Sequence, residues 1–388
     1  MPIRNTNILN KINKSNKHHL NKQNIKFFYR YFKLLLLFFI YLILKRNDKN
    51  KNNKYNINKK IRFIICNKPF HYNYGDESIL MSTIEFLNNS FPQLEQIIIN
   101  VEEILFKMNL IKYIINKNDI IIISGGGYFG LYEDVIEAQS NIIKCFPNNT
   151  IILFPCSIFY NNEKIQLYNK YINIFNNHSN LTLFTRENKS YVTALNLFKN
   201  KSIYIVPDIV TRLNISIFQK KTYKEGILLI LRKDELLLTD NDRNFIRDLS
   251  NKYFNNNVYE KDCMFEIPPG SSRKNETIKF INNISQKQLV ITDRLHGMIL
   301  SIITGTPCIV FGNSYHKIES SYYTWFKNLE YITFIQKDNI EKELEENIKK
   351  FKNFNNYTIF DSKIFNNYYL LMKNIIQNKI NLILEQIN

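Results

Sequence analysis

Beyond residue 60, the chain alternates short apolar runs with longer stretches in which apolar and polar residues recur at helical spacing. The apolar runs lack strict polar alternation and end in polar or glycine-containing segments, as is typical of strands buried on both faces. The runs that predict strands are 62–66, 95–101, 119–124, 150–154, 181–185, 203–206, 226–231, 289–292 and 307–311. Strands of this kind, separated by helices, predict an α/β fold in which helices cover both sides of parallel sheets.

The predicted strands fall into two series, separated by the polar stretch 211–224. We therefore expect a Rossmann-like domain at 61–215, a second one at 216–336, and C-terminal helices at 337–388. Open parallel sheets bind ligands at the carboxyl ends of their strands. The residues that directly follow the strands are therefore the candidates for a common cleft.

The N-terminal sixth of the chain has a different character. A basic tail (1–26) precedes a hydrophobic segment (27–44) and a polar, low-complexity stem (45–60). The hydrophobic segment contains Arg30 and Lys33 and falls just short of the ~20 apolar residues that a spanning helix needs. We expect it to act as an uncleaved membrane anchor; a membrane-surface helix and a buried domain helix are the alternatives. Both flanks are basic, so the orientation stays open, and the Golgi or secretory pathway is a compatible location.

The positive charge of the chain is concentrated at its N-terminus. The formal net charge is +18, of which residues 1–62 contribute +15 and the remainder only +3. The remainder shows no basic stripe with interleaved aromatic residues, the pattern typical of a nucleic-acid surface. We therefore expect no nucleic-acid partner.

The cysteines are too far apart in the sequence to predict a zinc site or a disulfide framework. They are Cys66, Cys145, Cys156, Cys263 and Cys308, and no CxxC pair occurs among them. Four lie within or beside apolar runs, where free cysteine usually acts as a small buried hydrophobe.

Two glycine-containing loops follow predicted strands and supply candidates for lining the cleft. In the segment 73–76 (NYGD), glycine permits a tight turn and aspartate suits a helix N-cap, so a purely structural role is equally possible. In the segment 124–127 (SGGG), consecutive glycines let the backbone approach a ligand, although neither GxGxxG nor a Walker A pattern is present. The candidates are Asn73, Gly75, Asp76, Gly125, Gly126 and Gly127.

A candidate anion-binding residue follows the predicted strand 181–185. Arg186 stands at the end of this strand, where a guanidinium can grip phosphate or carboxylate with two hydrogen bonds. A surface salt bridge with Glu187 explains the same residue equally well.

The segment 292–298 (TDRLHGM) joins a strand to an apolar helix and is the strongest functional signal. Ionisable side chains in such a place must pair with each other or meet a ligand, because unpaired burial is costly. Asp293 can serve a structural pair. Arg294 offers a permanent cation and His296 a proton that can move near neutral pH.

The loop after the last predicted strand, 311–317 (FGNSYHK), offers further polar groups to the same cleft. Asn313 and Ser314 are candidates for hydrogen bonds with an acceptor. His316 and Lys317 either reach the cleft or are solvated, and the sequence does not decide between these.

Taken in order, these motifs resemble the polysaccharide pyruvyl transferase family. The matching segments are NYGDESI (73–79), SGGGYFG (124–130), TRE (185–187), VPD (206–208), TDRLHGMILSIITGTP (292–307) and NSYHKI (313–318). The resemblance implies two Rossmann-like domains in a glycosyltransferase-B-like arrangement, phosphoenolpyruvate as donor, and a glycan as acceptor. It also implies that neither a metal nor a cofactor is needed, and that Arg294, His296 and an upstream arginine, best matched by Arg186, contact the donor. Relatives usually carry glycine where His316 stands, which affects the expected acceptor specificity.

The hypothesis that follows is a pyruvyl transfer onto a glycan containing galactose or mannose. Arg186 and Arg294 bind the two anionic groups of the donor, and His296 is the general acid. Asp76 is a candidate for orienting an acceptor hydroxyl. The alternatives are a nucleotide-sugar-dependent glycosyltransferase of the same architecture and a non-catalytic glycan-binding protein.

Overall fold

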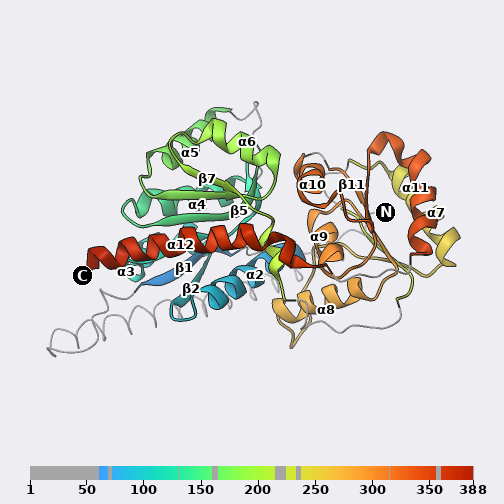
Figure 1. The fold of residues 1–388 in the computed structure, drawn as a ribbon, viewed down its shortest axis with the longest axis horizontal. Helices are drawn as coiled ribbons and strands as arrows, with labels where there is room; N and C mark the ends of the chain where they lie inside the picture. Colours follow the sequence, from blue (N-terminus) through green and yellow to red (C-terminus); the bar gives the residue numbers. More distant parts are fainter. Residues whose placement is uncertain are drawn as a thin grey trace, which may run out of the picture. The chain divides into compact units, whose positions relative to one another are not determined.

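The computed structural model describes residues 61–387, with gaps at 69–71, 131, 160–164, 215–223, 233–236, 314 and 355–359. The predicted tail, membrane anchor and stem fall on residues 1–60 and lie outside the described residues. Within the described part, no helix combines the length and the apolar character needed to cross a membrane. The described chain is built on two parallel sheets (Figure 1), which confirms the predicted α/β class.

In the first sheet, the described strands all pair in parallel, in the order β2-β1-β3-β5-β6-β7, with β4 beside β5. Their bounds are β1 (Arg62–Lys68), β2 (Glu95–Asn100), β3 (Ile120–Ile123), β4 (Gly126–Phe129), β5 (Ile151–Ile158), β6 (Leu181–Thr185) and β7 (Ser202–Ile205). All but β4 coincide with predicted apolar runs. The β4 strand starts within the triple glycine, which the hydropathy pattern assigns to a loop.

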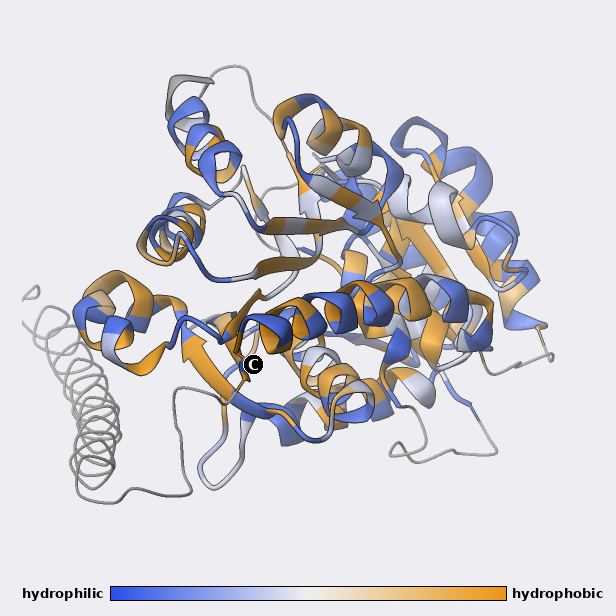
Figure 2. Ribbon diagram, turned by 60° about the vertical axis from the view of Figure 1, so that its left-hand side comes forward, coloured by the Kyte–Doolittle hydropathy of each residue, from blue (hydrophilic) through white to orange (hydrophobic). Residues whose placement is uncertain are grey.

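Helices cover both faces of the first sheet because successive side chains of a strand point to opposite sides. On one face, α2 and α12 share a core cluster with Phe63 and Ile65 of β1. On the other face, α4 contacts β1 and β4, and α6 contacts β5 and β6. Figure 2 shows these helices with an apolar and a polar side. The helices around this sheet are α2 (Tyr74–Ser90), α4 (Glu133–Cys145), α5 (Ile165–Asn177), α6 (Asn188–Leu197) and α12 (Asn366–Ile387). A further helix, α3 (Val101–Ile114), follows β2 along the chain.

The second sheet has the strand order β12-β11-β10-β8-β9, again with parallel pairing throughout the described part. Its strands are β8 (Ile227–Ile230), β9 (Val258–Glu260), β10 (Leu289–Thr292), β11 (Cys308–Phe311) and β12 (Ile332–Ile335). Alternate residues of β8 belong to different cores: Leu228 and Ile230 pack with α8 and α9, and Ile227 and Leu229 with α7 and α11. The helices are α7 (Asp240–Phe254), α8 (Arg273–Ser285), α9 (Leu295–Ile303), α10 (Lys317–Ser321) and α11 (Ile340–Lys352).

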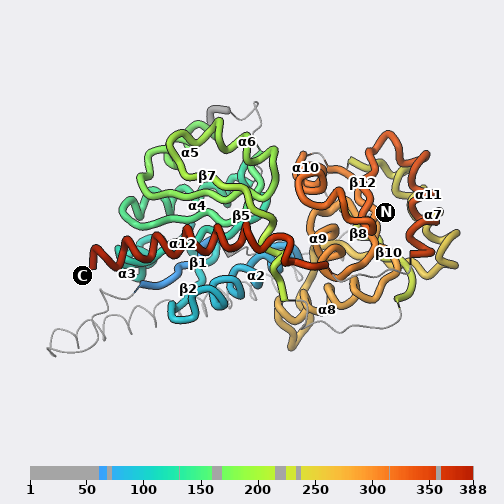
Figure 3. The backbone as a smooth tube through the Cα atoms, viewed as in Figure 1, coloured from blue at the N-terminus to red at the C-terminus, as the bar shows by residue number. Residues whose placement is uncertain are grey.

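After α11 the chain returns to the half of the molecule that contains the first sheet. Helix α12, red in Figure 3, packs there through Tyr369, whose hydroxyl lies 2.6 Å from the Thr211 hydroxyl. Near the other end of the helix, Lys379 donates a 2.7 Å hydrogen bond to Asn180. The predicted C-terminal helices are therefore present, and they belong to different halves. The predicted domain boundaries themselves stay predictions.

The two halves are joined beside the strand ends by an aromatic stack and by main-chain hydrogen bonds. The ring of Tyr74 lies between Phe265 and Phe280, with centroid separations of 4.1 and 4.0 Å and nearly parallel planes. The amide of Tyr74 donates to the carbonyl of Cys263 at 3.0 Å, and the amide of Phe265 to that of Tyr72 at 3.1 Å. This junction fixes the start of α2 against the loop that follows β9.

Candidate active site

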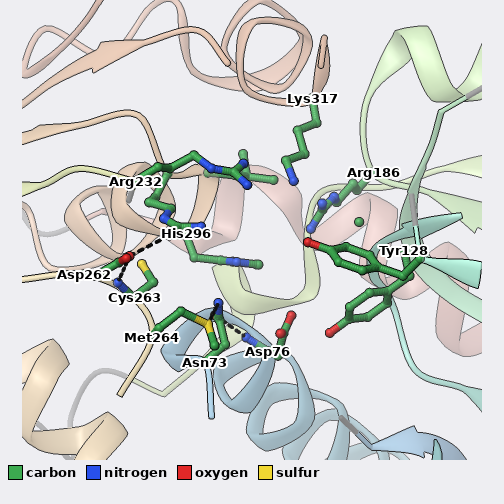
Figure 4. Close-up of a pocket in the computed structure, with 14 residues that line it drawn as sticks. Asn73, Asp76, Tyr128, Arg186, Arg232, Asp262, Cys263, Met264, His296 and Lys317 are labelled. Carbon is green, nitrogen blue, oxygen red and sulfur yellow. Dashed lines mark hydrogen bonds and ion pairs between the residues drawn. The ribbon is translucent and has the colours of Figure 1, made fainter. Parts of the chain in front are cut away.

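A cavity of about 560 Å³ lies where the carboxyl ends of strands from both sheets converge (Figure 4). Arg186 follows β6, Arg232 lies just beyond β8, and Arg294 lies just beyond β10. This is the position at which open α/β sheets bind ligands. The lining residues are Asn73, Asp76, Gly127, Tyr128, Tyr132, Arg186, Arg232, Asp262, Cys263, Met264, Arg294, Leu295, His296 and Lys317.

Hydrogen bonds and a buried ion pair fix the orientation of the Arg186 side chain. Its side chain is 1% exposed, its Nη1 donates to Asp208 Oδ2 at 2.7 Å, and its Nε donates to the Ser157 hydroxyl at 2.9 Å. The predicted alternative, a surface salt bridge with Glu187, is wrong. Glu187 is buried and caps α6 by accepting from the Ser190 amide at 2.9 Å.

Asp208 connects two of the predicted site residues. Its Oδ2 accepts from Arg186 and also lies 3.6 Å from His296 Nε2, and its Oδ1 accepts from the Val210 amide at 3.0 Å. Burial alone would raise the pKa of this carboxyl, but His296, Arg186 and the Val210 amide hold it well below its ordinary value. Asp208 is therefore an anion that fixes a cation and an imidazole on one side of the cavity.

His296 lies in the first turn of α9 and packs closely against α2. A Cβ added at Gly75 would lie 2.0 Å from His296 Nδ1, so only glycine leaves room for the ring at this point. With Nδ1 facing Gly75 and Nε2 facing Asp208, the imidazole has one orientation. Its side chain is 13% exposed, and this exposed part borders the cavity.

The ionisable residues before α9 divide into a structural and a cavity-facing part. Asp293 accepts from the Arg232 amide at 2.7 Å and lies 3.6 Å from Arg243 Nη2, so it serves a buried structural pair, as one interpretation of the sequence allowed. Arg294 borders the cavity, and its Nη2 donates to Asp262 Oδ1 at 2.7 Å. Asp293 therefore has a structural role, whereas Arg294 faces the cavity.

Lys317 and Arg232 add two further cations. Lys317, the first residue of α10, directs its side chain into the cavity beside Arg232 and Arg186 (Figure 4). Burial, and then the nearby Arg186 and Arg232, lower the pKa of Lys317 to about 7. Of the two possibilities for this lysine, the structure selects the one in which it reaches the cleft.

The wall across the cavity from Arg232 carries a carboxylate and two phenols. Asp76 and Tyr128 face the cavity there, and the side chain of Tyr132 is 44% exposed at its edge. Burial, followed by the Asp76 carboxylate, raises the pKa of Tyr128 well above its usual range, so the phenol keeps its proton. A carboxylate beside two phenols suits a polar, uncharged ligand with several hydroxyls.

Asn73 joins this wall to the opposite half of the chain. Its side-chain oxygen caps α2 by accepting from the amides of Gly75 at 2.8 Å and Asp76 at 3.3 Å. Its Nδ2 lies 3.5 Å from the sulfur of Met264. The predicted cap therefore exists, but Asn73 supplies it in place of Asp76, whose carboxylate is left to face the cavity.

Several of the predicted residues meet at the cavity and others do not. Those that line it are Asn73, Asp76, Gly127, Arg186, Arg294 and His296. Gly75 contacts His296 but does not line the cavity, and Gly125 lies against the Pro155 carbonyl, 2.3 Å from where its Cβ would be. Gly126 has a φ of +138° and faces the Tyr128 ring. Of the triple glycine, Gly127 is the residue that lines this cavity, while the space beside Gly125 and Gly126 is filled by the protein itself.

The loop before α10 contributes less than predicted. Asn313 does not line the cavity, and its side-chain amide is buried with no hydrogen-bond partner among the described residues. Ser314 lies outside the described residues. His316 is neither solvated nor in the cavity, because its Nε2 lies 3.7 Å from the buried Glu187 carboxylate.

Half of the residues that line the cavity were not predicted from the sequence. Arg232 directly follows the apolar run 226–231, so the same rule that selected Arg186 would have found it. Asp262, Cys263 and Met264 come from a loop with no pattern of its own. The cavity itself is dominated by cations, and among the described residues no cluster of His, Cys, Asp and Glu suits a metal ion.

The chain is similar in sequence to several known proteins. A profile of the polysaccharide pyruvyl transferase family matches residues 73–315. General stress protein 30 of Bacillus subtilis is 32% identical over 301 residues, which cover 76% of this chain and 86% of that protein. Pyruvyl transferase 1 of Schizosaccharomyces pombe is 29% identical over 280 residues, which cover 66% of this chain and 68% of that protein.

A solved structure shows the fold independently. A Listeria monocytogenes protein, described as a candidate UDP-N-acetylglucosamine 2-epimerase, superposes with a TM-score of 0.52 at 13% identity. The superposition covers 82% of this chain and 97% of that one. At this identity the likeness concerns the fold alone, and it agrees with a glycosyltransferase-B-like arrangement of the two sheets.

Proposed function

The chain belongs to the polysaccharide pyruvyl transferase family, and from this premise we propose that it transfers pyruvate from phosphoenolpyruvate to hydroxyls of a glycan sugar. The product is a pyruvate ketal. The observation that carries the proposal is the cationic cavity at the strand ends, in which Arg186, Arg294 and Lys317 surround His296. A small donor with a carboxylate and a phosphate is the ligand that such a pocket fits.

The donor-binding step relies on the two guanidinium groups that the sequence singled out. Asp208 binds Nη1 of Arg186, and Asp262 binds Nη2 of Arg294, each at 2.7 Å. Each carboxylate fixes its guanidinium without occupying every donor, because arginine carries five N–H groups. Preorganised cations of this kind stabilise the charge that develops in the transition state without having to reorganise.

The chemical step needs a proton at the methylene carbon of the donor. We assign its transfer to His296, whose Nε2 lies 3.6 Å from the Asp208 carboxylate, so that the proton is given from Nδ1 on the other side of the ring. Protonation of C3 makes C2 electrophilic, and a sugar hydroxyl then adds to C2. Phosphate leaves, and a second hydroxyl closes the ketal.

The acceptor fits best on the opposite wall. Asp76 faces this part of the cavity and can accept the proton of the attacking hydroxyl, and the Tyr128 phenol lies next to Asp76. The exposed ring of Tyr132 offers an apolar surface on which a hexose can stack. We propose a galactose- or mannose-containing glycan as acceptor.

The test is to incubate the protein with phosphoenolpyruvate and a panel of galactosides and mannosides, and to follow phosphate release and the added pyruvyl group by mass spectrometry. Parallel reactions with nucleotide sugars test the nucleotide-sugar-dependent glycosyltransferase. Release of a nucleoside diphosphate in place of phosphate would overturn the proposal. Glycan binding without any turnover or donor binding would instead indicate a non-catalytic glycan-binding protein.

A further inference from the structure

Lys317 is placed differently from the other cations of the cavity. Arg186 and Arg294 each form a short ion pair with a carboxylate, whereas Lys317 forms no ion pair with any described residue. Its Nζ lies 3.3 Å from the position that a Cβ at Gly127 would occupy, and Arg186 Nη2 lies 3.0 Å from the same point. The ammonium and the guanidinium therefore converge on one spot of the cavity wall.

The surroundings of Lys317 are strongly positive. The charged and titratable groups that face it are Arg186 after β6, Arg232 after β8, Arg294 before α9, Asp76 on α2, and the ring of Tyr315 in its own loop. Of these groups, only Asp76 carries a negative charge. A buried ammonium among three guanidinium groups is unstable by itself, and an anion in the cavity would stabilise it.

We propose that Lys317 binds the phosphate of the donor and passes its own proton to the phosphate oxygen that leaves C2. This inference rests on the function proposed above. It gives the lysine a task that no guanidinium can perform, because arginine does not lose its proton in proteins.

The step balances in atoms and charge. After the first hydroxyl has added, the bond between C2 and the phosphate oxygen breaks, and the electron pair stays on that oxygen. The oxygen takes a proton from Lys317 Nζ, hydrogen phosphate departs, and C2 becomes an oxocarbenium centre that the second hydroxyl attacks. The two protons lost by the sugar hydroxyls equal the one added to C3 and the one that leaves on phosphate.

Lys317 should then take up a proton when the donor binds. Burial and the neighbouring cations hold the pKa of the free lysine at about 7, so at about pH 8 most molecules start with a neutral amine. A bound phosphate restores the ammonium. Lys317 therefore becomes positively charged as the donor binds.

The experiment is titration calorimetry of the full chain with phosphoenolpyruvate at about pH 8, in buffers that differ in ionisation enthalpy. We expect uptake of close to one proton by the native protein, and none by Lys317→Arg, which stays charged. The exposed Lys327 provides the matched control, because Lys327→Met should take up the same proton as the native protein. Binding without proton uptake, or uptake that persists in Lys317→Arg, would overturn the inference.

Kinetics separate the binding role from the proton transfer. Lys317→Arg should keep the donor KM within a few-fold but lose about 10²–10⁴-fold in kcat, as expected when a general acid is removed. Lys317→Met should both raise the donor KM and lower kcat. Native-like turnover of Lys317→Arg refutes the proton transfer. If the native protein binds no phosphoenolpyruvate at all, the proposed function itself is wrong, and this result is distinguishable from the others.

Discussion

Replacing Asp208 with asparagine removes the one negative charge that Arg186 and His296 share. Arg186 is 1% exposed and Asp208 4%, and their atoms Nη1 and Oδ2 are 2.7 Å apart. Removing one partner of a buried ion pair costs about 3–5 kcal/mol, because the other charge stays buried without compensation. Asparagine keeps an oxygen for the Val210 amide, so the cap is not part of this loss. We expect the free energy of unfolding to fall by about this amount.

The effect should depend on pH in a specific direction. The pKa of Asp208 is lower in the folded protein than in the unfolded chain, so its stabilisation is fully present above the ordinary aspartate pKa of about 4 and is lost as the pH falls further. The native protein should lose this contribution in acid, and Asp208→Asn has none to lose. The difference in stability between the two proteins should therefore shrink below about pH 4.

Urea unfolding at several pH values measures both quantities. The control is Glu260→Gln, which breaks the ion pair with Arg247 in which the side chains are 46% and 38% exposed. An exposed pair contributes only ~0–1 kcal/mol. If Asp208→Asn and Glu260→Gln lose equally little stability near neutral pH, Asp208 is not the anchor of the site and the reasoning fails.

Further changes test the remaining assignments. His296→Ala should lower kcat by about 10²–10⁴-fold, as measured by phosphate release, with donor affinity less affected; near-native turnover would contradict its role as proton donor. Gly75→Ala places a Cβ 2.0 Å from His296 Nδ1, so kcat should fall while the circular dichroism spectrum stays native. Asp76→Asn should reduce kcat without weakening donor binding in calorimetry, and a loss of donor affinity would place Asp76 on the donor side.

Strands that are apolar on both faces could be predicted from the sequence with the least ambiguity. Runs such as 181–185 and 289–292 coincide with strands because burial on both sides leaves no place for polar residues. The edge strand β9 contains Tyr259 and Glu260, which are exposed. Since this strand is short and only partly covered, its hydropathy does not distinguish it from a loop.

The site was predictable where chemistry directly follows a strand. Arg186, Arg294 and His296 stand at such positions, so sheet geometry brings them together. The function of Asp208 was not predictable in the same way, because the motif VPD shows neither of its partners. Its contacts with Arg186 and His296 are tertiary, 22 residues away along the chain in the case of Arg186, and arise only from packing.

At the triple glycine, the sequence alone does not predict the role of each residue. Three glycines after a strand suggest a cradle for an anion, but Gly125 meets the Pro155 carbonyl and Gly126 faces the Tyr128 ring. The sequence shows that the backbone needs room at this point. It does not show whether a ligand or the protein itself occupies that room.

The return of α12 to the first half has a consequence for the order of events during synthesis. The hydroxyl of Tyr369 donates to the main-chain carbonyl of Asp208 at 2.9 Å and lies beside the Thr211 hydroxyl. The segment that positions Asp208 thus gains these bonds only after residues 366–387 have left the ribosome. A nascent chain that has completed both sheets therefore still lacks the contacts that Tyr369 makes beside Asp208, and the site is complete only after α12 has packed onto the first sheet.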